Sequence, residues 1–218
     1  MQGKLSVVAT PIGNLEDITL RALRTLKEAE VVACEDTRRT RKLLAHFDLH
    51  TPTSSLLHVQ KLLEQGKHVA LVSDAGTPGV SDPGLEIVSR ARDAGATIEA
   101  IPGASALTAA LSIAGLRVAG FTFYGFLPLK KGREKLFNEI AESERASIFY
   151  ESPHRIVKTL GALAKRLPTE RRVGLFRELT KLYEEHMVGS AADVLERVTS
   201  NSNAQRGEFV VIVEGSYN

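Results

Sequence analysis

The sequence predicts an α/β protein with two domains, an N-terminal one on a mostly parallel sheet and a C-terminal one on a mixed sheet. Up to Arg117, short apolar runs alternate with amphipathic segments, which is typical of βα units with parallel strands. After Arg117, two strand-like runs follow each other closely enough to form an antiparallel hairpin. We therefore expect domains at residues 1–117 and 118–218, with a cleft between them.

In the first domain, short and continuously apolar runs indicate strands that are buried on both faces. The runs cover residues 5–10, 31–36, 68–73 and 97–102. Segments with apolar residues at helical spacing predict the helices. They cover residues 19–29, 36–47, 59–65, 83–94 and 105–114. The polar segment 50–57 is expected to be a loop.

The second domain begins with an aromatic strand and ends with an apolar one. The expected strands cover residues 121–127, 146–150, 172–180, 183–189 and 208–214, and Lys181-Leu182 forms the hairpin turn. A basic loop at 130–135 leads into a helix that ends at residue 143. Further helices are expected from Pro153 to residue 167 and over 191–199, with a polar loop at 201–206. The hairpin makes this sheet mixed rather than purely parallel.

Composition excludes several classes of protein. Hydrophobic residues make up 43% and charged residues 25% of the 218 residues, as in soluble globular proteins. No apolar run approaches the roughly 20 residues that span a bilayer, and no secretory signal is present, so we expect a cytoplasmic protein without membrane contact. Cys34 is expected to be a buried thiol, and no spacing of Cys and His indicates a metal. The net charge of +2 neither demands nor excludes nucleic acid.

Several expected strands end in glycine, proline and small polar residues. The richest such segment is 71–84, LVSDAGTPGVSDPG. Comparable segments with glycine or proline follow the strands that end near residues 10, 102 and 151. The simplest interpretation is a set of tight strand-to-helix turns. In an open α/β sheet, however, ligands bind beyond the carboxyl ends of the strands, so several such ends favour one shared binding site.

Six segments, in this order, resemble those of the bacterial 16S ribosomal RNA cytidine 2′-O-ribose methyltransferases of the tetrapyrrole methylase superfamily. They are TPIGNLED at 10–17, EDTR at 35–38, SDAGTP at 73–78, FYESPHR at 149–155, RELTK at 177–181 and GEF at 207–209. The resemblance covers about residues 5–215. It implies S-adenosylmethionine (AdoMet) in the cleft, a homodimer, and 16S rRNA or the 30S subunit as substrate.

The resemblance assigns the cofactor to loops of both domains. The residues are Pro11, Asp74, Ala75, Gly76, Thr77, Pro78, Pro102, Gly103, Ala104 and Ser105, and in the turn 125–128 Phe126 and Leu127. The sequence departs from the family twice. A His-Glu-x-Asn stretch is absent between Ser55 and Leu56, so either this loop is short or residues are missing, and we favour missing residues. A Lys-rich tail beyond Gly215 is absent as well, and its absence is expected to lower the affinity for RNA.

A ribose 2′-hydroxyl is a poor nucleophile until its proton is removed, so a general base is expected. Glu151 is the first candidate because it ends a strand; His154, Lys181 and, more distantly, Asp36 follow. A carboxylate that caps a helix is the alternative for Glu151, and a packing role is the alternative for His154.

Basic side chains beside the expected cleft are candidate phosphate contacts, and solvated helix or loop faces are the alternative. They are Arg38, Arg39, Arg41, Lys42, Lys130, Lys131, Arg133, Arg155 and Arg177. Tyr124 or Tyr150 could stack on bases of single-stranded RNA. Two other functions share parts of this pattern: a methylase of small tetrapyrroles, and an RNA-binding module without catalysis.

Overall fold

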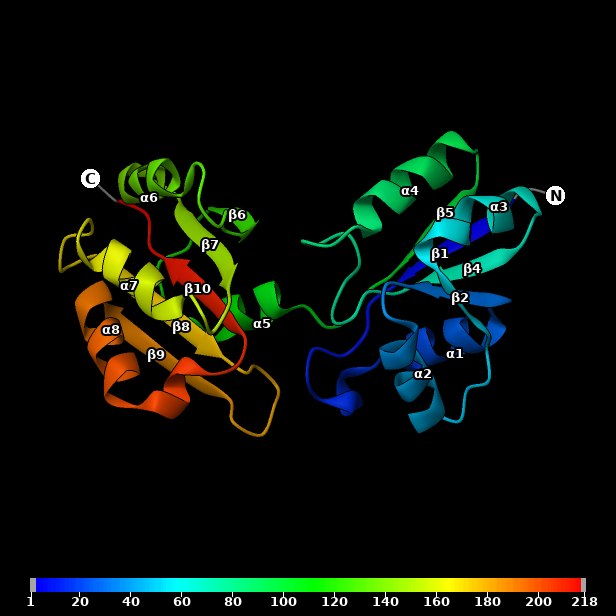
Figure 1. Ribbon diagram of the computed structural model, residues 1–218, viewed down its shortest axis with the longest axis horizontal. Coiled ribbons are helices and arrows are strands. Elements are labelled where there is room, and N and C mark those ends of the chain that lie inside the picture. Colours follow the sequence, from blue (N-terminus) through cyan, green and yellow to red (C-terminus); the bar gives the residue numbers. More distant parts are fainter. Residues whose placement is uncertain (1–2, 217–218) are drawn as a thin grey trace. The chain divides into compact units, whose positions relative to one another are not determined.

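The computed structural model describes residues 3–216. The chain divides into two compact units, Met1–Ser105 and Ala106–Asn218, whose elements are labelled in Figure 1. This division precedes the expected boundary at residue 117. The reason is α5 (Ala106–Ile113), which contacts β10 (Phe209–Val213) and therefore belongs with the second unit. The cleft expected between the domains stays a prediction.

The first unit contains one parallel sheet with strand order β3-β2-β4-β1-β5. The strands are β1 (Lys4–Val8), β2 (Val31–Cys34), β3 (Thr53–Ser55), β4 (His68–Leu71) and β5 (Thr97–Ile101). Apolar side chains of α1 (Leu20–Glu28) and α2 (Thr37–His46) share one core cluster with the sheet. Those of α3 (Val59–Glu64) and α4 (Gly84–Asp93) share another, so the sheet is covered on both faces (Figure 1).

The expected loop at 50–57 is wrong, because it contains β3 and a 3₁₀ helix at Leu56–His58. β3 has only three residues, all polar and partly buried, and pairs with β2 through Val32 and Thr53. Such a short edge strand carries no alternation of apolar and polar residues that sequence could reveal. The other strands and helices of this unit lie within about two residues of their expected limits, which is the usual precision of assigned boundaries.

The second unit contains a mixed sheet with strand order β6-β7-β10-β8-β9. The strands beside β10 are β6 (Phe121–Phe126), β7 (Ala146–Glu151), β8 (Arg172–Arg177) and β9 (Glu185–Ser190), and only β6 and β7 run parallel. The helices α6 (Arg133–Glu142), α7 (Ile156–Ala164) and α8 (Ala191–Ser200) contribute to one core cluster with the sheet. The predicted fold class is thereby confirmed.

Two connections of the second unit differ from the sequence-based expectation. The helix expected from Pro153 begins at Ile156, because Ser152 O accepts from the backbone N–H groups of both Arg155 and Ile156 and so closes a turn first. The two-residue hairpin is wrong as well. Residues 178–184 connect β8 to β9, and the positive φ angles of Glu178 (52°) and Thr180 (66°) take the chain out of the strand.

Candidate functional site

The loops that follow β1, β4 and β5 are joined directly in the first unit. Their strands are parallel, so their carboxyl ends lie at one edge of the sheet. Thr10 and Gly76 exchange both backbone hydrogen bonds, with N···O distances of 2.9 and 3.0 Å. Thr77 Oγ1 donates to Ala104 O at 3.2 Å. The structure therefore brings together the three loops that hold the predicted cofactor residues of this unit.

Two glycines permit this close approach of the loops. Gly76 has a φ of +76°, and a Cβ there would lie 3.2 Å from Ile12 Cγ2. A Cβ on Gly103 would lie 3.0 Å from Cβ of Ala9. Larger side chains would push the loops apart, which explains the residue type at both positions.

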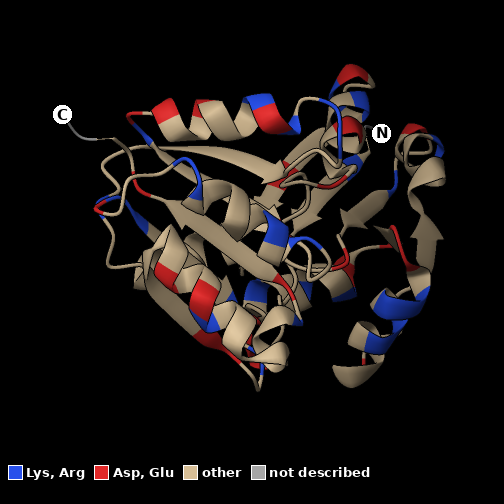
Figure 2. Ribbon diagram, turned by 60° about the vertical axis from the view of Figure 1, so that its left-hand side comes forward, with Lys and Arg blue, Asp and Glu red and all other residues tan. Residues whose placement is uncertain are grey.

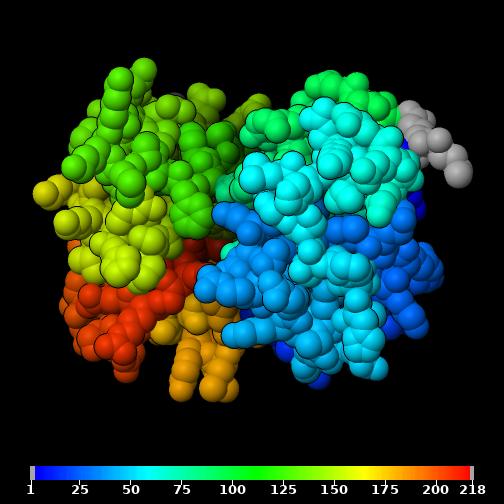
Figure 3. All heavy atoms as spheres, turned by 45° about the vertical axis from the view of Figure 1, so that its right-hand side comes forward, coloured from blue at the N-terminus to red at the C-terminus, as the bar shows by residue number. Residues whose placement is uncertain are grey.

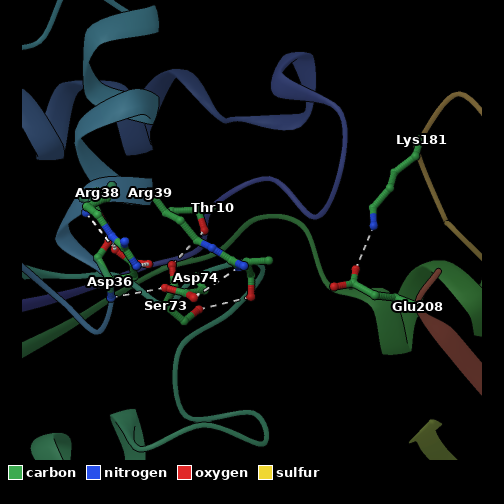
Figure 4. Close-up of polar contacts among 10 residues, drawn as sticks. Thr10, Asp36, Arg38, Arg39, Ser73, Asp74, Lys181 and Glu208 are labelled. Atoms are coloured by element: carbon green, nitrogen blue, oxygen red, sulfur yellow. Dashed lines mark hydrogen bonds and ion pairs between the residues drawn. The ribbon is translucent and has the colours of Figure 1, made fainter. Parts of the chain in front are cut away.

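Asp74 connects this group of loops to the end of β2. Its Oδ1 accepts a long hydrogen bond from the backbone N–H of Asp36 at 3.3 Å, and its Oδ2 pairs with Arg39 at 3.2 Å (Figure 4). Asp36 caps α2 by accepting from the backbone N–H of Arg38 at 2.8 Å. Hydrogen bonds from the Arg38 side chain and backbone lower the pKa of Asp36, which makes it a poor proton acceptor.

The four predicted RNA-binding cations of this unit lie on α2, and all four residues are exposed. They are Arg38, Arg39, Arg41 and Lys42. Figure 2 marks the Lys and Arg positions along the ribbon in blue. Arg38 and Arg39 pair with Asp36 and Asp74, and Arg41 donates to the Thr37 carbonyl. α2 reaches the molecular surface in the view of Figure 3. These pairs are exposed and weak, so they leave the cations available to a stronger anion.

In the second unit, Glu151 is buried and accepts from several donors, which the sequence did not predict. Its Oε1 accepts from Arg155 at 2.7 Å and from the Ser152 N–H at 2.8 Å. Its Oε2 accepts from Arg133 at 3.0 Å and from Thr159 Oγ1 at 2.6 Å. The side chain has no exposed surface. These contacts favour a structural role for Glu151 over the expected role of general base, which stays a prediction.

Three of the expected phosphate contacts are also engaged inside the second unit. Arg133 donates to Pro128 O, Arg155 donates to Leu127 O, and both pair with Glu151. Arg177 donates to Arg206 O and pairs with Glu185. Their side chains are only 12–18% exposed. These contacts favour a structural role for the three arginines, and their expected role toward RNA stays a prediction.

The neighbouring turn carries the other expected ligand-binding residues of this unit. Lys130 and Lys131 are exposed, Phe126 is 56% exposed and Leu127 is buried. Phe126 packs edge-on against Tyr150, with ring centroids 5.5 Å apart. Tyr150 itself is only partly exposed, so it offers less surface for base stacking than the sequence suggested.

Lys181 lies between two carboxylates. Its Nζ donates to Glu178 Oε1 and to Glu208 Oε2, both at 2.8 Å, and Figure 4 shows the second contact. Burial lowers the pKa of Lys181, but the hydrogen bonds that it donates to these carboxylates outweigh this effect, so the pKa is raised. Lys181 is therefore a cation at neutral pH and cannot accept a proton. His154, by contrast, is exposed in the turn after β7.

Sequence reasoning missed the partners of these side chains. Thr159 on α7, and Glu178 and Glu208 around Lys181, take part in the contacts above. No local signal indicates Thr159 or Glu208, because Thr159 is buried by the fold and Glu208 is far from Lys181 in the sequence, whereas Glu178 lies only three residues before Lys181 and its spacing could have suggested the pair. Among residues 3–216, no group of three or more His, Cys, Asp or Glu side chains is placed to hold a metal ion. Within the same range, no helix is long and apolar enough to cross a membrane.

The family model of tetrapyrrole (corrin/porphyrin) methylases matches residues 4–195. The chain belongs to the tetrapyrrole methylase family. Among family members, the chain is 44% identical to the ribosomal RNA small subunit methyltransferase I of Pasteurella multocida over 226 positions, covering 99% of this chain and 80% of that protein. It is 46% identical to the protein of the same name from Vibrio cholerae, covering 97% of this chain and 77% of the relative. The predicted resemblance is confirmed.

Solved structures agree with the fold of this family member. The uroporphyrin-III C-methyltransferase of Thermus thermophilus complexed with S-adenyl homocysteine superimposes with a TM-score of 0.66 at 20% identity, covering 97% of each chain. Because the alignment with the Pasteurella relative spans 226 positions and this chain has 218 residues, at least eight positions of that relative have no counterpart here. Where these positions fall along the chain is not given by the identity and coverage, so the absence expected between Ser55 and Leu56 stays a prediction.

Proposed function

We propose that the protein is an AdoMet-dependent 2′-O-ribose methyltransferase that acts on a cytidine in 16S ribosomal RNA. The observation that carries the proposal is the joining of the loops after β1, β4 and β5 in a chain that is 44–46% identical to named rRNA methyltransferases. The names of these relatives support rRNA as the substrate. Action on the 30S subunit, a homodimeric state and a cytosolic location stay predictions.

The residues at the joined loops fit AdoMet by their chemistry. The cofactor combines a sulfonium cation with an amino acid group and a nucleoside, which suit carbonyl oxygens, a carboxylate and close backbone contact. The loops provide all three through Asp74, the strand-end carbonyls and Gly103. When bound, AdoMet supplies an electrophilic methyl group. In the first unit, Pro11 and residues 74–78 and 102–105 would hold it, and in the second unit Phe126 and Leu127 would contact it.

The protein must position the ribose 2′-hydroxyl and accept its proton. Of the expected proton acceptors, Glu151 is enclosed and Lys181 is a cation, so we assign the role to His154. His154→Ala should lower kcat by about 10²–10⁴-fold, the usual contribution of a general base, with AdoMet binding unchanged. His46→Ala, an exposed histidine at the end of α2, is the matched control. A kcat of His154→Ala close to that of the wild type would remove this assignment.

RNA binding is assigned to the exposed cations Arg38, Arg39, Arg41, Lys42, Lys130 and Lys131. Each phosphate contact that is lost should reduce the slope of log K against log salt by about 0.7–0.9. We therefore expect Arg41→Gln/Lys42→Gln to flatten the salt dependence of RNA binding. An unchanged slope would exclude these two residues from the RNA interface.

The decisive experiment compares three methyl acceptors. Radiolabelled AdoMet is incubated with the full chain and with 30S subunits, naked 16S rRNA or a porphyrinogen, and the methylated nucleotide is mapped. Label at a cytidine 2′-oxygen supports the proposal. Label in the porphyrinogen alone favours a tetrapyrrole methylase, and RNA binding without AdoMet binding favours a non-catalytic module.

A further inference from the structure

The turn after β6 is held by charged side chains that converge on one buried carboxylate. Arg155 Nη1 donates to Leu127 O at 2.9 Å, and Arg133 Nη1 donates to Pro128 O at 3.0 Å. The other ends of both guanidinium groups pair with Glu151. Two successive carbonyls of the turn are thus tied to one residue on β7.

Glu151 is itself fixed from two further directions. Thr159 Oγ1, from α7, donates to it and accepts from Arg133 at 2.7 Å. The backbone N–H of Ser152 donates to its other oxygen. The guanidinium of Arg133 also lies over the ring of Phe137, 5.0 Å from its centroid. Glu151, Arg133, Arg155 and Thr159 thus form one hydrogen-bonded network. In a network whose polar groups are all paired, the side chains are held rigidly.

The turn is also held by the buried Leu127 side chain, which packs in the core cluster, and by the ring contact between Phe126 and Tyr150, but its outer part is exposed. Gly125 has a φ of +60°, and Leu129 is 76% exposed next to the exposed Lys130 and Lys131. Pro128 has no N–H group with which to form a backbone hydrogen bond. The carbonyls of Leu127 and Pro128 are thus the points at which hydrogen bonds from charged side chains fix the backbone of the turn.

We infer that Glu151 is a positioning residue, which acts through Arg133 and Arg155 to hold the 125–129 turn in the shape that binds AdoMet. The inference rests on the proposed function, in which Phe126 and Leu127 contact the cofactor. It assigns Glu151 to cofactor affinity and not to proton transfer. A turn that is already ordered before AdoMet binds loses less conformational entropy on binding, which increases the affinity.

The test measures AdoMet binding by calorimetry and methyl transfer by the full chain carrying Glu151→Gln. We expect the Kd for AdoMet to rise on the order of tenfold, because the turn must then be ordered on binding. At saturating AdoMet, kcat should stay within about threefold of the wild-type value, since the transition state loses no interaction of its own. Hydrogen exchange at the Leu127 and Leu129 amides should become faster.

Glu214→Gln is the matched control. Glu214 is a buried carboxylate of the same unit that pairs with Arg172 at 2.8 Å and accepts from the Arg117 N–H, but it has no contact with the turn. The Glu214→Gln variant should reduce Tm as Glu151→Gln does, but it should leave the Kd for AdoMet unchanged. If Glu151→Gln does not fold, Arg155→Lys tests the same connection, because lysine lacks the two separate guanidinium nitrogens that contact Leu127 O and Glu151.

The outcomes separate the possibilities. A fall of kcat by about 10²-fold or more at unchanged Kd would make Glu151 a general base and overturn the inference. Equal Kd values for the wild type, Glu151→Gln and Arg155→Lys would reduce the network to a purely structural one and overturn it as well. A wild-type chain that does not bind AdoMet would overturn the proposed function, and this inference with it.

Discussion

The two units organise their strand ends by different physical means. In the first unit, the loops after β1, β4 and β5 are joined mainly by backbone groups, as in the Thr10–Gly76 pair, and glycines allow the close approach. In the second unit, the turn after β6 is held by side chains, through Arg133, Arg155 and the buried Glu151. A backbone arrangement depends on residue size and φ, whereas a side-chain arrangement depends on charge balance. The two should therefore fail in different ways under substitution.

The largest difference should appear when charge balance is removed from the second unit. Glu151→Ala should lower the free energy of unfolding by about 3–5 kcal/mol, because it leaves two largely buried guanidinium groups without a counter-charge. The measurement is urea unfolding, followed through the transition of the second unit. The control is Glu86→Ala in α4, whose pair with Arg90 is exposed and should be worth less than about 1 kcal/mol. Equal losses for the two variants would contradict the contrast between the units.

A backbone defect in the first unit should cost less stability but more function. Gly76→Ala should lower the free energy of unfolding by about 1–2 kcal/mol, because alanine is strained at positive φ. Its Cβ would also press on Ile12 and separate the loops, so the KM for AdoMet should rise.

Gly115→Ala is the control for Gly76. Gly115 has a φ of +57°, and no atom lies within 4 Å of the position of its missing Cβ. It should show the same strain and an unchanged KM. A similar rise of KM in both variants would mean that the close approach at Gly76 has no special role.

Alkaline pH should weaken the ion pairs that Lys181 forms with Glu178 and Glu208 in the second unit. Burial lowers the pKa of Lys181, but the bonds to Glu178 and Glu208 raise it further, so the folded pKa exceeds the unfolded one. The stability contributed by Lys181 is therefore complete below about pH 10.4 and is lost as the pH rises through the folded pKa. Thermal unfolding of the wild type and Lys181→Met across this range should converge as the pH rises. A constant difference between them would contradict the assigned shift.

Acidic pH should give a smaller effect, in the first unit. Burial, aided by the charge of Lys4, lowers the pKa of His68, whose Nε2 lies 2.9 Å from Ser6 Oγ. The unfolded chain therefore binds the proton more readily, and stability should fall as the pH drops below about 6.5 toward the folded pKa. His68→Gln should remove this part of the slope. The same slope in both proteins would show that His68 does not contribute.

The contrast also explains what the sequence could predict. The joined loops were predictable because glycine and proline after apolar runs indicate tight strand ends, as at 73–78 and 102–105. The roles of charged residues were not. Arg155 and Lys131 both appear as cations beside a loop in the sequence, but only the fold buries one and exposes the other. Likewise, Glu151 appears as a strand-end carboxylate until Thr159 and Arg133 are placed around it.

The backbone pair between Thr10 and Gly76 couples two loops that are more than sixty residues apart in the sequence. Neither loop can open without breaking the two hydrogen bonds that they share. The amides of residues 10 and 76 should therefore exchange with solvent deuterium through one common opening event, with equal free energies and equal dependence on denaturant. Substitutions in the two loops should then be non-additive, so that damage to either one already includes much of the damage to the other.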